Sequence, residues 1–143
     1  MTAAVDTSII SELWAGQSRA SQADMLLSEA RSLGRVVISG IVYAELLAHP
    51  GASPKFVDQF LDTTRIQVDA DLPKAVWRLA GIRYRDYSAR RRASSANPGH
   101  RRLLADFVIG AHALLAADQL MTFNAADFRR DFPELKLTPT VPR

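Results

Sequence analysis

Short apolar runs alternate with longer amphipathic stretches along this chain of 143 residues. Short β-branched or apolar runs are typical of buried strands, and apolar residues that recur every three or four positions indicate helices. We therefore expect strands at 3–5, 35–39, 65–68, 119–123 and 135–138, and helices at 8–16, 21–33, 41–48, 53–61, 71–91, 102–117 and 125–132. Strands alternating with helices in this way favour a parallel sheet.

Glycine and proline mark several of the expected helix ends. Gly16 and Gly34 follow the first two helical patterns, and His49-Pro50-Gly51 ends the third. Ser53 followed by Pro54 is a typical helix start, because serine caps free backbone N–H groups and proline fits the first turn. The stretch "ASSANPG" (93–99) is the clearest loop in the sequence.

These elements predict an α/β fold, a three-layer α/β/α sandwich with a central, mostly parallel sheet. The length suits one hydrophobic core. We find no internal repeat or linker, so we expect a single domain over residues 1–143. In open parallel sheets, sites form beyond the carboxyl ends of the strands, so acidic residues that belong to a site should follow strands.

Three isolated acids lie among residues that otherwise look like core. Asp6 directly follows the strand at 3–5, and Glu45 lies one turn into the helix after the strand at 35–39. Asp106 interrupts "LLADFVIGAHALL" (103–115), which is apolar all round and therefore typical of a buried helix. Any one of these acids is most simply explained by a partner arginine or by the helix dipole. Three of the same character favour a shared site.

If the three carboxylates converge, a cation would relieve their mutual repulsion. Carboxylate oxygens suit Mg²⁺ or Mn²⁺, whereas zinc usually takes histidine or cysteine. The chain has no cysteine, and His49, His100 and His112 are not spaced as a ligand pair. The pattern therefore favours a hard divalent cation.

Other acid-based and nucleophilic sites fit the sequence poorly. A haloacid-dehalogenase-type phosphatase would carry Asp-x-Asp after the first strand, where this chain has Asp6-Thr7-Ser8. A response-regulator receiver would carry an aspartate after a middle strand, and "RVVISGIVYAE" has none at the strand end. Neither a Gly-x-Ser-x-Gly elbow nor a phosphate-binding glycine loop is present.

Composition and charge bear on the partners and the location of the protein. The formal net charge is +3 with a pI near 9.7, which permits an acidic partner or nucleic acid without demanding one. No apolar run approaches the roughly 20 residues of a membrane span, and "MTAAVDTSII" lacks a secretion signal. We therefore expect no membrane association and a cytoplasmic location, which the absence of cysteine also fits.

Arginines gather in "RYRDYSARRRASSANPGHRR" (83–102), where tyrosines accompany them. Such a stretch can hold phosphates and stack on bases. A solvated helix end followed by a loop is the equally ordinary alternative. The candidate RNA-binding residues are Arg90, Arg91, Arg92, Arg101 and Arg102.

Four segments together resemble the motifs of PIN domains. They are "VDTSII" (5–10), "YAELL" (43–47), "LLADFVIGAHAL" (103–114) and "LMTFNAADF" (120–128). Their order and spacing are similar to those of the small stand-alone members, the VapC-type toxins of bacterial toxin–antitoxin pairs. The resemblance covers essentially the whole chain, and each motif alone is loose.

The resemblance implies a Mg²⁺- or Mn²⁺-dependent endoribonuclease with an acidic pocket at one edge of the sheet. By motif position, Asp6, Glu45 and Asp106 would be the catalytic and metal-binding acids. Asn124 would be a further metal ligand at a position that is often aspartate, which leaves open whether one or two metals bind. Ser8 and Thr122 match positions that orient the acids. The resemblance also implies an RNA substrate, an antitoxin partner and a homodimer.

Two other functions stay open at this stage. One is a PIN-like binding module that holds a metal or a partner but cuts nothing, and Asn124 is the residue that favours it. The other is a metal-dependent nuclease acting on DNA. Apolar residues that form either a partner-helix groove or ordinary core are Ile9, Leu13, Trp14, Phe56 and Phe60.

Overall fold

The structure is a computed structural model that describes residues 1–94 and 102–139. Within these residues all twelve expected elements are present in the expected order. The strands are β1 (Thr2–Val5), β2 (Arg35–Ser39), β3 (Ile66–Asp69), β4 (Gln119–Met121) and β5 (Leu137–Thr138). The helices are α1 (Thr7–Ala15), α2 (Ala20–Leu33), α3 (Gly40–Leu47), α4 (Pro54–Thr64), α5 (Lys74–Ala93), α6 (Leu104–Ala116) and α7 (Ala125–Asp131).

The five strands form one sheet in the order β3-β2-β1-β4-β5. Every neighbouring pair is parallel, so the sheet is wholly rather than mostly parallel over the described residues. β1 lies at its centre, with Ala4 opposite Val37 of β2 on one side and Leu120 of β4 on the other. The chain winds outward from β1 through β2 to β3, and then returns to place β4 on the other side of β1.

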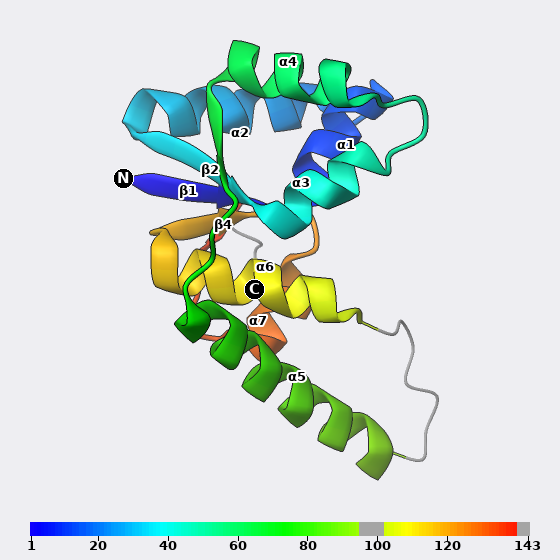
Figure 1. The fold of residues 1–143 in the computed structure, drawn as a ribbon, viewed down its shortest axis with the longest axis vertical. Coiled ribbons are helices and arrows are strands. Elements are labelled where there is room, and N and C mark those ends of the chain that lie inside the picture. The colour runs from blue at the N-terminus through cyan, green and yellow to red at the C-terminus, as the bar shows by residue number, and fades with distance from the viewer. Residues whose placement is uncertain (95–101, 140–143) are drawn as a thin grey trace.

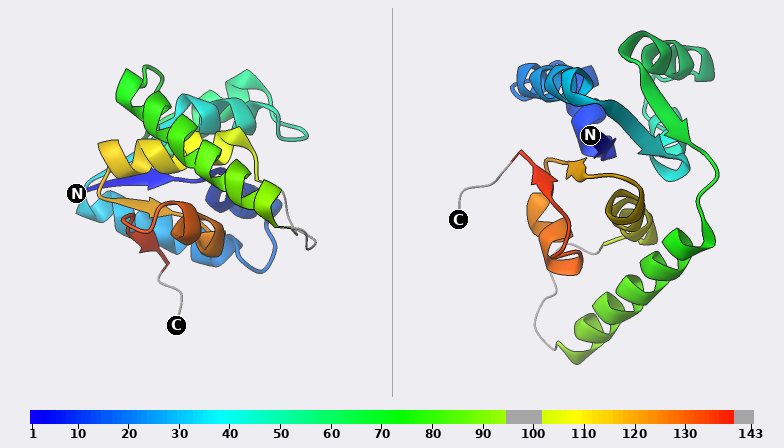
Figure 2. Two further views of the ribbon diagram at one scale, coloured as in Figure 1. Left: turned by 90° about the horizontal axis from the view of Figure 1, so that it is seen from below. Right: turned by 90° about the vertical axis from the view of Figure 1, so that its left-hand side faces the viewer.

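Helices cover both faces of the sheet, which confirms the three-layer prediction (Figures 1 and 2). In the right-hand view of Figure 2, α1, α2 and α4 lie on one side, and α6 and α7 lie on the other with α5 outside α6. α3 follows β2 directly and contacts both α1 and α6. It therefore connects the two helical layers at the carboxyl end of β2.

Glycine and serine set the helix boundaries, as the sequence predicts. Gly16 ends α1 in the left-handed region at φ 64°, where glycine has no side chain to strain. Ser53 caps α4 by accepting a hydrogen bond from Phe56 N at 3.1 Å, with Pro54 in the first turn. Ser39 caps α3 in the same way through Val42 N at 3.4 Å.

The apolar helix α6 is the buried helix that its pattern predicts. Residues 107–113 are all buried. Gly110 permits a close approach, because a Cβ there would lie 2.3 Å from Cε2 of Phe132. Phe132 follows α7, so this approach brings the end of α7 onto α6. α6 also packs against α5 and against β1 and β4 of the sheet, and this packing fixes the position of its first turn, which carries Asp106.

The strand order reverses between β1 and β4, and this switch point lies at the centre of the sheet. Loops after two such strands leave in opposite directions and form a crevice at their carboxyl ends. Asp6 follows β1 at this place, and Thr122 follows β4. No helix in the described part of the chain is long and apolar enough to cross a membrane.

Candidate functional site

Asp6 is held at the switch point by two hydroxyl groups. It is only 4% exposed and follows β1 as the N-cap residue of α1. Ser8 Oγ and Thr122 Oγ1 both donate to its Oδ2, at 2.7 and 2.8 Å. Thr122 Oγ1 accepts from Asn124 N at 2.9 Å, which fixes the hydroxyl. The first turn of α1 and the end of β4 thus orient one carboxylate together.

The electrostatic environment of Asp6 is unfavourable for its charge. Burial raises the pKa of Asp6 above its ordinary value of 3.8, because water no longer solvates the anion. The hydrogen bonds from Ser8 and Thr122 oppose that rise, and the negative charge of Asp106 adds to it. A buried carboxyl with a raised pKa in a crevice is typical of a functional group.

Glu45 lies on α3 and is held from α1. Thr7 Oγ1 donates to its Oε1 at 2.7 Å. Burial raises the pKa of Glu45 above its ordinary value of 4.5, and the charges of Asp6 and Asp106 raise it further. Thr7, next to Asp6 in the chain, therefore positions a second carboxylate from another helix.

Asp106 lies in the first turn of α6 with 31% of its side chain exposed. Its Oδ2 accepts from Leu103 N at 3.1 Å and lies 3.9 Å from Nε of Arg102. A partner arginine, the simplest explanation for a lone acid, is thus present near Asp106. The distance between the two side chains is nevertheless longer than a hydrogen bond. The charge of Asp106 still acts on Asp6 and Glu45.

The three carboxylates lie within electrostatic reach of one another but do not converge on one point. Among the described residues, no group of three or more Asp, Glu, His or Cys side chains is arranged to hold a metal ion. Each carboxylate is held by its own donors, and like charges resist closer approach. The donor set, which consists of hard carboxylate oxygens, nevertheless matches Mg²⁺ or Mn²⁺ in kind.

Asn124 follows Thr122 by two residues and is linked to Asp6 through that threonine. It is exposed, it precedes α7, and its side chain does not cap that helix. Its backbone N–H, rather than its side chain, connects it to the acid through Thr122 Oγ1. The structure therefore connects Asn124 to the site through its backbone.

The candidate RNA-binding arginines separate into different environments. Arg102 is 2% exposed, forms a buried ion pair with Asp131 and stacks between Phe107 and Phe128, at 4.8 and 5.0 Å from the ring centroids. Arg90 pairs with the other carboxylate oxygen of Asp131. The prediction that Arg102 binds RNA is therefore wrong, because its guanidinium is buried and not accessible to RNA. Arg101 lies outside the described residues.

Arg91 and Arg92 end α5 without an ion pair to the described residues, and Arg92 is exposed. Figure 1 shows the end of α5 reaching away from the sheet. The arginine stretch thus combines a structural part, which anchors α7 to α5 and α6, with an exposed part at the helix end.

Two residues of the site are not singled out by the sequence pattern. Thr7 orients Glu45, and its only signal is its place in the first helical turn after Asp6. Asp131, at the end of α7, binds Arg90 and Arg102 and thereby fixes the segment just before α6. Asp131 follows two arginines in "DFRRDF" (127–132), and this local pattern does not indicate partners so far away in the chain.

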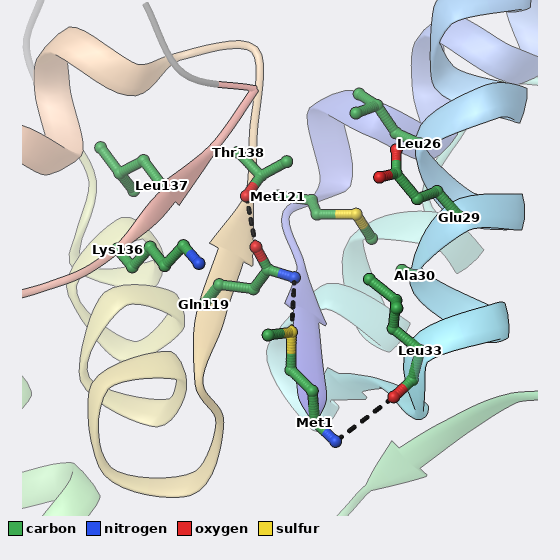
Figure 3. Close-up of a pocket in the computed structure, with 10 residues that line it drawn as sticks. All are labelled: Met1, Leu26, Glu29, Ala30, Leu33, Gln119, Met121, Lys136, Leu137 and Thr138. Atoms are coloured by element: carbon green, nitrogen blue, oxygen red, sulfur yellow. Dashed lines mark hydrogen bonds between the residues drawn. The ribbon is translucent and has the colours of Figure 1, made fainter.

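A cavity of about 260 Å³ opens elsewhere, between α2 and the strands β4 and β5. In Figure 3, Leu26, Glu29 and Leu33 face Met121 and Gln119 across it. Gln119 accepts from Thr138 and donates to Met1 Sδ, so its amide is used within the fold. None of the three acids lines this cavity.

His112 also lies apart from the acids. It is buried in α6, and its Nε2 lies 2.8 Å from Oδ2 of Asp69, at the end of β3. A buried histidine with a carboxylate partner satisfies its hydrogen-bonding groups within the fold. His112 therefore acts as a structural residue that connects α6 to the sheet.

The fold and the acids define a class of protein: a three-layer α/β/α fold with carboxylates at the carboxyl-end crevice of a parallel sheet. The chain belongs to the PIN domain family, whose family model matches residues 3–131. This confirms the resemblance in the four motifs. Members of the family are nucleases that generally use divalent metal ions. A comparison with curated proteins finds no match.

Solved structures with the same fold support this assignment. VapBC-1 from nontypeable Haemophilus influenzae matches with a TM-score of 0.64 and 22% identity, over 96% of this chain and 97% of that one. VapBC2 from Rickettsia felis, in a structure bound to a DNA fragment from its promoter, matches with a TM-score of 0.63 and 22% identity, over 96% of this chain and 97% of that one. At this identity the likeness establishes the fold.

Proposed function

We propose that the protein is a Mg²⁺- or Mn²⁺-dependent endoribonuclease and the toxin of a VapBC-type toxin–antitoxin pair. The observation that carries the proposal is the buried carboxylate of Asp6. Two hydroxyls hold it at the switch point of the sheet. The charge of Asp106 raises its pKa, and the charges of Asp6 and Asp106 raise the pKa of Glu45. Membership of a nuclease family supports the chemistry, and the VapBC neighbours support the toxin role.

In this proposal, Asp6, Glu45 and Asp106 hold the cation, and the exposed Asn124 amide joins them from the rim. A divalent ion, when bound, acidifies water and stabilises negative charge on phosphate. Ser8 and Thr122 keep the Asp6 carboxylate in one orientation, and Thr7 does the same for Glu45. Fixed carboxylates need little reorganisation during reaction, which is the source of electrostatic catalysis.

We propose that RNA reaches the acids past the exposed end of α5, where Arg91 and Arg92 meet its phosphates. Arginine binds phosphate through planar paired donors, so two guanidinium groups without an ion pair to the described residues suit this role. Arg90 is half exposed beside Asp131 and contributes less.

We propose an antitoxin surface over α1 and α4. Trp14 lies 5.2 Å from Phe56 and 5.3 Å from Phe60 between ring centroids, and Phe56 is 47% exposed. Ile9 is fully buried, so it belongs to the core rather than to this surface. We also propose a homodimer, as the family resemblance implies.

A second candidate is a PIN-like module that binds a partner without cutting RNA. The observation that favours it is the spread of the carboxylates, which do not converge on one point among the described residues. Asn124 in place of a fourth acid favours it too. The two proposals differ in one outcome, namely hydrolysis.

The purified protein is expected to cut single-stranded RNA internally with Mg²⁺ or Mn²⁺, and EDTA is expected to stop cleavage. Attack by water needs no 2′-hydroxyl, so the products should carry 5′-phosphate and 3′-hydroxyl ends, which end-labelling and mass spectrometry identify. Cyclic phosphate ends would exclude this mechanism, and full activity in EDTA would exclude the metal. Inert protein on transfer, ribosomal and messenger RNA would favour the binding module, and cleavage of DNA alone would favour a DNA nuclease.

Mg²⁺ is expected to stabilise the folded protein through the three acids. A ligand at one hundred times its Kd adds about 2.7 kcal/mol to the free energy of unfolding. Thermal melts should show this increase in the wild type and a smaller one in Asp106→Asn. Asp24→Asn, on the exposed face of α2, is the matched control and should respond like the wild type. Equal responses in all three proteins would contradict a shared site.

The same acids should give EDTA-treated protein a characteristic pH dependence. A carboxyl whose pKa is raised on folding binds its proton more tightly in the folded state. The free energy of unfolding should therefore fall as pH rises from the ordinary values, 3.8 for Asp6 and 4.5 for Glu45, through their raised values. In Glu45→Gln the free energy of unfolding should fall less over this pH range. An unchanged pH profile would show that the pKa of Glu45 is not raised by folding.

A further inference from the structure

We propose that a nucleobase of single-stranded RNA binds in the cavity between the start of α2 and the turn from β4 to α7, stacked against Arg19 and Phe123. The cavity measures about 500 Å³, within the range of small-molecule sites. Its lining consists of Arg19, Gln22, residues 122–127 and Pro139. The inference rests on the proposed function, because it assigns the cavity to the substrate of the neighbouring acids.

The cavity begins one side chain away from Asp6. Thr122 lines it and also donates to Asp6 Oδ2 at 2.8 Å. Asn124 lines it as well and is tied to Thr122 through its backbone N–H. A nucleotide whose phosphate lies at the acids therefore has the cavity within reach of its base.

Arg19 and Phe123 provide a surface for stacking. Arg19 Cζ lies 5.0 Å from the centroid of the Phe123 ring, although Arg19 precedes α2 and Phe123 lies in the turn after β4. Every nucleobase has a planar face that stacks on aromatic rings and on guanidinium groups. The backbone of Phe123 is fixed as well, since its N–H donates to Ser8 Oγ at 3.1 Å.

The rest of the lining supplies groups that can read the edge of a base. Gln22 and Asn124 are exposed and carry amides, which donate and accept at once. Asp127 adds an acceptor. A planar cationic surface beside amides fits a base better than it fits an apolar protein side chain.

Binding to fluorescein-labelled single-stranded oligouridylate tests the cavity in the Asp6→Asn background, which removes cleavage. Arg19→Ala and Phe123→Leu should each weaken binding about fivefold or more, as expected for loss of one stacked base. Arg31→Ala is the matched control: it removes the same charge from α2 at a residue whose guanidinium donates to Ser28 instead. A 5-iodouridine oligomer should crosslink to the peptide that contains Phe123 on irradiation.

An abasic oligomer separates base from phosphate. Arg19→Ala should affect its binding no more than Arg31→Ala does. An equal loss on abasic and base-containing oligomers would assign Arg19 to phosphate and overturn the stacking proposal. Binding like that of Arg31→Ala in both cavity variants, or crosslinks that map elsewhere, would overturn it as well. Arg19 is exposed, so its variant tests the proposal even if Phe123→Leu fails to fold.

Failure of this inference is distinct from failure of the proposed function. If the wild type cuts RNA and the cavity variants bind RNA normally, the base site is wrong and the nuclease stands. If the wild type cuts nothing but Arg19→Ala weakens binding only to base-containing RNA, the base site stands and the hydrolytic function is wrong.

Discussion

Asp6→Asn, Glu45→Gln and Asp106→Asn are each expected to abolish RNA cleavage, with losses of at least about a hundredfold in rate. Each substitution removes one negative charge and keeps the size of the side chain. The acids lie at the start of α1, in α3 and in α6, and their charges act on one another. The losses should therefore not add in double variants. Rates on a defined RNA oligomer with Mg²⁺ measure this.

Asn124 should behave differently from the three acids. Asn124→Ala should cost less, because it removes a neutral ligand at the rim, and Asn124→Asp should retain or raise the activity. Asp24→Asn, at an exposed position of α2, is the control for loss of a negative charge. Circular dichroism must show that each variant folds. Wild-type rates in Glu45→Gln and Asp106→Asn would disprove the shared acidic site, whatever Asp6→Asn does.

Asp131→Asn is expected to destabilise the fold by about 3–5 kcal/mol, because it leaves a buried guanidinium without its counter-charge. Asp131 and Arg102 are 4% and 2% exposed, and Asp131 also receives Arg90. In a chain of this length the change corresponds to a fall of roughly 6–20 °C in melting temperature. Denaturant titration and thermal melts measure the effect.

A double variant separates the ion pair from the packing around it. Arg102→Met combined with Asp131→Leu removes both charges and keeps apolar volume between Phe107 and Phe128. Replacing both members of a buried pair by apolar residues is often nearly neutral, so the double variant should be clearly more stable than Asp131→Asn. If Asp131→Asn loses no more stability than Asp24→Asn, the pair contributes nothing to the stability of the fold.

The Arg102–Asp131 pair also explains why charge clusters are hard to interpret from sequence. Residues 90–92 and 101–102 look alike in the sequence, as runs of arginine around a loop. The fold directs Arg102 inward, because Asp131 at the end of α7 lies where α6 begins. It leaves Arg92 at the exposed end of α5. The difference depends on a contact between residues 29 positions apart, which no local pattern contains.

The sequence by itself determined the element order, the parallel sheet and the positions of the three acids after their strands or in their helices. These follow from local causes: the spacing of apolar residues, helix caps such as Ser53, and glycine stops such as Gly16. The four motifs determined the family. Periodicity and capping act between neighbours in the chain, so they can be read without knowing the fold.

Only the tertiary structure decided which side chains act together. It brought Thr122 onto Asp6 across 116 positions, Thr7 onto Glu45 across 38, and Arg19 onto Phe123 beside a cavity. It also kept the three carboxylates apart and committed Arg102 to Asp131. Burial, pKa and pairing depend on what packing places within a few ångströms, and a long-range contact leaves no trace in the spacing of residues along the chain.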